Sequence, residues 1–201
     1  MLAHIKNLAS ERQIRLLAIA IARLRWQELP TELRSVIEFA TLLADGLASE
    51  GDRLRYVKTA YAKAMMANPN HFPAYSAVLK TVGCWRPGMD VSVTPAWEIA
   101  RYGTANLQPA IIRDIFGNPF KNIVFDRSWI TSDVANLASD IYDNNNFNLL
   151  PILGESLQKA GCNDRDIIHH CLDRNTHVRG CWVVDNILGF VVNSTVVISQ
   201  D

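Results

Sequence analysis

Residues 10–26, with the sequence SERQIRLLAIAIARLRW, decide the fold class that this chain predicts. Ser10 followed by Gln13 has the spacing of a capping box, in which the two residues satisfy backbone groups at the start of a helix. Apolar residues then recur three or four positions apart, at Ile14, Leu17, Ala18, Ile21 and Leu24. This spacing places them on one face of a helix. The segment therefore predicts an amphipathic α-helix that packs against other helices.

The same periodicity continues through most of the chain, and Pro, Gly and Asn residues separate one segment from the next. The further predicted helices span residues 31–46, 52–67, 73–82, 97–102, 108–116, 131–142, 147–160, 163–173 and 176–188. We therefore expect an all-α protein in which short loops make successive helices neighbours. The β-branched tail over 191–199 and residues 122–125 are the candidates for extended structure.

A change in composition near residue 84 indicates a domain boundary. Residues 84–93, CWRPGMDVSV, contain Pro and Gly and show no helical periodicity. We expect an antiparallel helical bundle over residues 1–83 and a C-terminal helical module over residues 84–201, and the two can pack as one domain. The third helix of the bundle has a predicted buried face made of Leu54, Val57, Ala60, Tyr61 and Ala64.

The composition indicates an ordinary globular protein. Apolar residues make up 49% of the 201 residues, and 20 Lys and Arg residues balance 20 Asp and Glu residues. Proteins that bind nucleic acid are usually basic overall or along one stripe, so this balance argues against nucleic acid as a partner. The start of the chain lacks a signal-peptide pattern, and its apolar run over 16–22 is too short to span a membrane. We expect a cytoplasmic protein whose cysteines stay reduced.

Residues 162–189, CNDRDIIHHCLDRNTHVRGCWVVDNILG, hold three of the four cysteines and three of the five histidines. In the predicted helix over 163–173, an apolar arc is formed by Ile167, Ile168, Cys171 and Leu172. Cys171 is therefore expected to be a core thiol, which packs as a small apolar residue. The neighbouring histidines are expected at the edges of this arc.

In the predicted helix over 176–188, His177 and Cys181 are one turn apart and would share a face. Together with Cys162 and His170 they could supply four tetrahedral ligands to zinc. The spacing Cys-x7-His-x6-His-x3-Cys differs from that of standard zinc fingers, whose paired ligands are about two to five residues apart. We expect no cofactor, with zinc as the alternative.

A third hypothesis makes Cys181 a nucleophile, with His177 as its base and Asp185 as the residue that orients the base. A thiol packed among Val and Leu residues within a helix is inert, which argues against this hypothesis. The simplest hypothesis gives the cluster no chemistry: His177 lies in the first turn of its helix and Cys181 lies in the core. Asp114 is expected on a solvated helix surface.

Several stretches resemble a group of uncharacterised bacterial proteins that is most abundant in planctomycetes. They are ASERQIRLLAIAIARLRW (9–26), ADGLASE (44–50), IIRDIFGNPF (111–120), LPILGESLQKAGCNDRDIIHHC (150–171) and HVRGCWVVDNILG (177–189). The likeness covers roughly residues 9–50 and 108–189, and the strings RDIFGNPF and HVRGCWVVD are its most specific parts. Residues 59–105 depart from the group. The resemblance implies a recurring α-helical domain, and it implies neither an activity nor a catalytic residue.

Together these patterns predict a non-catalytic protein-interaction or adaptor domain, because no constellation of catalytic side chains stands out. The expected partner is another protein, and neither nucleic acid nor a membrane is expected. The alternative is a structural zinc-binding or thiol-dependent protein that uses the cluster between Cys162 and Cys181.

Overall fold

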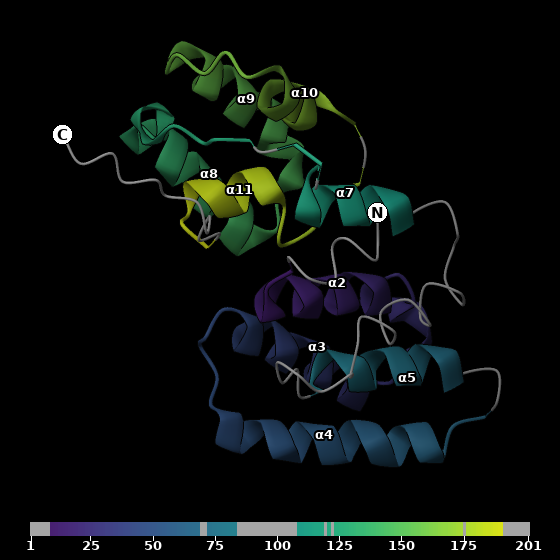
Figure 1. Cartoon of the computed structure of the whole chain (residues 1–201). Helices are drawn as coiled ribbons and strands as arrows, with labels where there is room; N and C mark the ends of the chain where they lie inside the picture. The colour runs from purple at the N-terminus through teal and green to yellow at the C-terminus, as the bar shows by residue number, and fades with distance from the viewer. Residues whose placement is uncertain are drawn as a thin grey trace. The chain divides into compact units, whose positions relative to one another are not determined.

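The computed structural model describes residues 9–68, 72–83, 108–118, 120–121, 123–174 and 176–190 (Figure 1). These residues form nine α-helices and three short 3-10 helices, and none of them lies in a strand. The α-helices are α2 (Glu11–Arg23), α3 (Thr31–Ala44), α4 (Glu50–Met65), α5 (Phe72–Thr81), α7 (Gln108–Phe116), α8 (Ser132–Asn144), α9 (Leu150–Lys159), α10 (Arg165–Leu172) and α11 (Trp182–Ile187). The all-α prediction is confirmed. The predicted helix over 97–102 and the tail over 191–199 lie outside the described residues.

The chain forms two compact units. The first contains Met1–Phe120 together with Val178–Gly180, and the second contains Lys121–His177 and Cys181–Asp201. Helix α7 belongs to the first unit because it packs against α2 and buries its isoleucines in the core of that unit. The units therefore divide after Phe120, whereas the composition of the sequence places the boundary near residue 84.

Helix α2 is the centre of the first unit and packs against α3, α5 and α7. Its predicted capping box is present, because the Ser10 hydroxyl accepts a hydrogen bond from the Gln13 N–H at 3.2 Å and the Gln13 side chain accepts one from the Ser10 N–H at 3.0 Å. Residues 15–22 are all buried. Helix α2 is thus covered on every side, whereas the sequence predicts a single buried face.

One residue of this buried stretch is charged. The guanidinium of Arg15 donates a hydrogen bond to the Thr81 carbonyl oxygen at 2.6 Å and pairs with the Glu11 carboxylate at 2.8 Å. A buried cation is costly unless it is paired and hydrogen-bonded, and both conditions are met here. The same contact joins α2 to the C-terminal end of α5.

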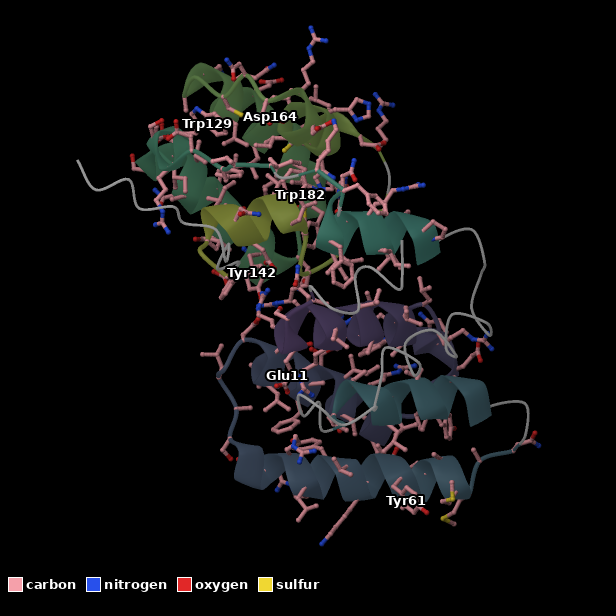
Figure 2. The ribbon with its side chains drawn as sticks, in the orientation of Figure 1. Glu11, Tyr61, Trp129, Tyr142, Asp164 and Trp182 are labelled. Atoms are coloured by element: carbon pink, nitrogen blue, oxygen red, sulfur yellow. The ribbon has the colours of Figure 1, made fainter. Side chains whose placement is uncertain are left out.

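Helix α4 buries a different face from the predicted one. The two alanines of the predicted face are buried, but Leu54 and Tyr61 are more than half exposed. The packed face includes Tyr56 instead, whose ring stacks on Phe39 of α3 with centroids 3.9 Å apart. Such stacking adds to the free energy gained by burying the rings. It turns α4 so that Tyr61 points away from α3 and α5 (Figure 2).

The second unit is built from α8 to α11. Helix α9 packs against α8 and α10, and α11 packs against the same two helices. Thr131 caps α8. Helix α10 is capped by Asp164, because the Asp164 carboxylate accepts hydrogen bonds from two N–H groups of the first turn, at 2.8 and 3.1 Å. A carboxylate at this position also interacts favourably with the helix dipole.

Helices α9 and α10 approach each other closely at Gly154. A Cβ atom at this position would lie 2.8 Å from the Cβ of Cys171. Cys171 is fully buried, as its place in the apolar arc predicts. Because the obstacle is a Cβ atom, which is fixed to the backbone, a side-chain rotation cannot relieve the contact. Gly154 is therefore required for the distance between these two helices.

We expect Gly154→Ala to lower the free energy of unfolding by about 1–3 kcal/mol, because the added methyl overpacks the contact with α10. The matched control is Gly51→Ala in α4, where the nearest atom to the new Cβ is the Ser49 hydroxyl at 3.7 Å. That change should raise stability by up to about 1 kcal/mol, since alanine favours the helix over glycine. Urea unfolding measures both values. Equal effects would contradict the close packing at Gly154.

Candidate metal centre

The chain is not helical between Thr176 and Cys181, so the predicted helix over 176–188 is wrong in its first half. Helix α11 begins only at Trp182, with Cys181 as its N-cap residue. Gly180 has a φ of +98°, a left-handed conformation that strongly disfavours residues with a side chain. An added Cβ would also lie 2.9 Å from Cδ1 of Leu16. These two constraints end any helix before Gly180.

The tripeptide Val178–Gly180 packs within the first unit. The Val178 N–H donates a hydrogen bond to the Asp114 carboxylate at 2.8 Å, and Arg179 pairs with the Asp45 carboxylate at 3.1 Å. Asp114 is only 2% exposed, so the prediction of a solvated aspartate is wrong for this residue. The sequence predicts a solvated position for Asp114 because local periodicity does not reveal a hydrogen bond from a residue 64 positions away.

Three of the four predicted metal ligands come together in the second unit. The Nε2 atom of His170 lies 3.1 Å from the Sγ atom of Cys181. The ring of His170 meets the ring of His177 edge-on, with centroids 5.0 Å apart. One potential ligand atom of each of these three residues lies within 4.8 Å of the others. His170 and His177 are partly buried, and Cys181 is completely buried.

The surroundings of the two imidazoles restrict their orientation. Nε2 of His177 lies 3.1 Å from the carbonyl oxygen of Asp173, the residue that ends α10. Because a carbonyl oxygen only accepts, this contact requires a hydrogen on Nε2, and in the neutral ring the lone pair is then on Nδ1. Histidines that bind metals are commonly held in this way. The ring of Trp182 lies against His170, with centroids 5.2 Å apart.

Cys162, the fourth predicted ligand, is buried in the core of the second unit and is not part of this group. Burial raises the pKa of its thiol, which favours the protonated form over the thiolate that a metal binds. Cys171 lies between α9 and α10. Cys84, the remaining cysteine, lies outside the described residues.

The three converging residues fit zinc. Tetrahedral zinc lies about 2.0–2.1 Å from imidazole nitrogens and about 2.3 Å from a thiolate, so nitrogen and sulfur ligands are roughly 3.5 Å apart. The separation of 3.1 Å between His170 and Cys181 is close to this value. Side-chain movements of roughly 1 Å would bring all three atoms to bonding distance. Two imidazoles and one thiolate suit the borderline softness of zinc and leave one position for water or another donor.

The geometry argues against the hypothesis that Cys181 is a nucleophile. His170 has a ring nitrogen 3.1 Å from the Cys181 sulfur, and a ring nitrogen of His177, the base of this hypothesis, lies within 4.8 Å of the same sulfur. His177 does not lie in the first turn of a helix, and Asp185 is buried in α11 at 1% exposure. A nucleophilic thiolate must be reached by its substrate, and the buried Cys181 is not. The arrangement therefore supports metal binding better than covalent catalysis.

Searches against protein-family models, curated proteins and solved structures gave no match for this chain. The resemblance of its motifs to the planctomycete group thus stays an expectation. None of the described helices has the length and apolar character that crossing a bilayer requires.

We expect Gly180→Ala to lower the free energy of unfolding by about 2–5 kcal/mol, from about 1–2 kcal/mol of left-handed strain and the contact with Leu16. Two control glycines also have positive φ, Gly46 at +72° and Gly161 at +97°, and neither has an atom within 4 Å of an added Cβ. Their alanine variants should lose only the strain energy. If all three variants lose the same stability in urea, the Leu16 contact is not what requires glycine.

Proposed function

We propose that this chain is a non-catalytic helical protein that binds zinc through His170, His177 and Cys181. The carrying observation is the convergence of three ligand atoms within 4.8 Å at a place where one of them is a buried cysteine sulfur. The residues come from α10, the loop after it and the N-cap of α11. Zinc would join these three segments.

The chemistry of the ligand set supports this proposal. The backbone of Cys181 is restricted on both sides, because Gly180 packs against Leu16 and α11 begins at the next residue, Trp182. His177 is oriented by the Asp173 carbonyl oxygen, and His170 is held against Trp182. Sites with restricted ligands lose less conformational entropy when the metal binds. In a reducing compartment the thiol would remain available as a ligand.

The test is zinc binding by the purified chain, with the metal measured by elemental analysis and its affinity by competition with a chelating dye. We expect one zinc ion per chain. His170→Ala, His177→Ala and Cys181→Ser should each weaken binding by more than about 100-fold, because each removes one of three ligands. With cobalt in place of zinc, the sulfur-to-cobalt charge-transfer band should disappear in Cys181→Ser.

Two control variants make this test specific. His169→Ala changes the exposed histidine next to His170 and should leave the affinity within about threefold of the original. Cys162→Ser should do the same, and a large loss there would instead support the four-ligand set that the sequence predicts. Sub-stoichiometric zinc, or equal affinity in all variants, would rule the site out.

The thiol-dependent alternative makes a different prediction. If Cys181 is a metal ligand in a buried site, iodoacetamide should label it slowly in the native protein and more slowly still after zinc is added. Unfolding in urea should restore labelling at the rate of a free thiol. Rapid native labelling of Cys181 that slows in His170→Ala would instead identify a thiolate activated by imidazole. Mass spectrometry of peptides reports each cysteine separately.

A further inference from the structure

Helix α4 carries a row of apolar side chains on the side that does not pack. Leu54, Tyr61 and Met65 are each more than half exposed, and Met66, the C-cap residue, is 86% exposed. Steps of seven and four residues place the first three along one line of the helix. We call these four residues the α4 stripe. Single exposed apolar residues are ordinary, but several in one row indicate a binding surface.

The α4 stripe lies in a basic part of the chain. Residues 53–89 contain no Asp or Glu. Their basic residues are Arg53, Arg55, Lys58, Lys63, Lys80 and Arg86. The whole chain has equal numbers of acidic and basic residues, so this segment is locally unbalanced. Arg55 and Lys58 are exposed on α4, and Lys58 lies one turn from both Leu54 and Tyr61. A negatively charged partner would be attracted to this surface.

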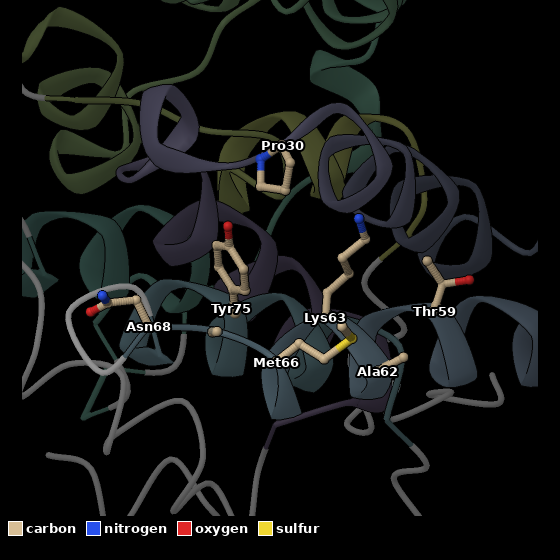
Figure 3. Close-up of a pocket in the computed structure, with 8 residues that line it drawn as sticks. Pro30, Thr59, Ala62, Lys63, Met66, Asn68 and Tyr75 are labelled. Carbon is tan, nitrogen blue, oxygen red and sulfur yellow. The ribbon is translucent and has the colours of Figure 1, made fainter.

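A groove of about 420 Å³ opens beside the end of the stripe (Figure 3). It is lined by Pro30, Thr59, Ala62, Lys63, Met66, Ala67, Asn68 and Tyr75. Figure 3 shows the side chains of Lys63 and Tyr75 extending toward Pro30, with Met66 between their bases. The Lys63 ammonium pairs with the Glu32 carboxylate at 2.6 Å. The groove therefore combines a mostly apolar lining with an ion pair at one side.

We propose that the α4 stripe and the groove bind an acidic amphipathic helix of another protein. Apolar side chains of that helix would enter the groove and cover the stripe, in the manner of helix-in-groove recognition. Its carboxylates would lie opposite Arg55 and Lys58, which orients the helix and speeds its association. The two methionines suit this role because their unbranched side chains adapt to different apolar partners.

The shape of the surface favours a peptide over a lipid bilayer. Basic and apolar residues together also occur on helices that lie on anionic membranes. A bilayer surface does not place single anchoring side chains in a hollow, whereas a helical peptide does. The groove, which Met66 joins to the stripe, is thus the observation that decides between the two. This inference does not depend on zinc binding, since every residue in it belongs to the first unit.

The experiment measures binding of the full chain to a synthetic helical peptide by fluorescence anisotropy. The peptide has about 16 residues, with Leu at i, i+3, i+4 and i+7 and Glu at the remaining positions, and a matched peptide carries Lys in place of Glu. We expect the acidic peptide to bind at least about tenfold more tightly than the basic one, with a difference that shrinks as salt is raised.

Variants locate the binding surface. Met66→Glu and Lys58→Glu change exposed positions. Each should lower the affinity for the acidic peptide by about tenfold or more while leaving the thermal unfolding transition of the protein unchanged. The control Ile152→Glu alters an apolar residue of α9 that is 51% exposed and should have no effect. Equal binding of both peptides, or loss with Ile152→Glu as well, would overturn the proposal. So would tighter association with vesicles of phosphatidylcholine and phosphatidylserine that depends on the same residues.

Discussion

Leu16 occupies the space that a side chain at residue 180 would need, and the backbone of Gly180 has a left-handed conformation. This pair of constraints requires glycine at residue 180 and excludes a helix that runs through it, and α11 begins at Trp182. It therefore makes Cys181 an N-cap residue, whose sulfur lies beside His170. With a side chain in place of the hydrogen, the local backbone would have to move, and Cys181 is the next residue along it.

Charged groups inside the first unit show how its apolar core keeps a defined arrangement. Asp45 has a nearly buried carboxylate that pairs with Arg12 at 3.2 Å and with Arg179 at 3.1 Å. Buried ion pairs contribute little net stability, but removal of one partner leaves an uncompensated charge and is strongly destabilising. The triad thus disfavours alternative packings of the end of α3 and of the tripeptide Val178–Gly180. We expect it to provide specificity, because a uniformly apolar contact would allow several positions.

The sequence predicts most helices well because their signals are local. The capping box at Ser10, the apolar spacing after it and the glycine after α7 are all contained in one segment of the chain. Prediction fails where a distant residue decides. The stacking of Tyr56 on Phe39 decides which face of α4 packs. Gly180, with its left-handed φ and its close contact with Leu16, interrupts the helix that the spacing of His177 and Cys181 suggests. No periodicity within either helix contains this information.

The candidate site illustrates the same limit. The density of Cys and His residues points to His170, His177 and Cys181. The prediction that His177 and Cys181 share one face of a helix is wrong, because the residues between them form a loop. Cys162 belongs to the same dense segment but packs in the core of the second unit, where its N–H donates a hydrogen bond to the Leu157 carbonyl oxygen at 2.9 Å. Composition can indicate candidate ligands, whereas the fold determines which of them lie close together.

The dependence of the ligand arrangement on the fold also determines how zinc binding would affect the stability of the protein. The three ligand atoms converge only when α10, the following loop and α11 are in place, so the unfolded chain would bind zinc more weakly. A ligand present at about 1,000 times its dissociation constant, and bound only by the folded state, stabilises that state by about 4 kcal/mol. That is more than the loss of about 1–3 kcal/mol expected from overpacking at Gly154. The helices of the second unit have between six and thirteen residues. Stabilisation by zinc would therefore be a substantial part of the free energy of unfolding of this small unit.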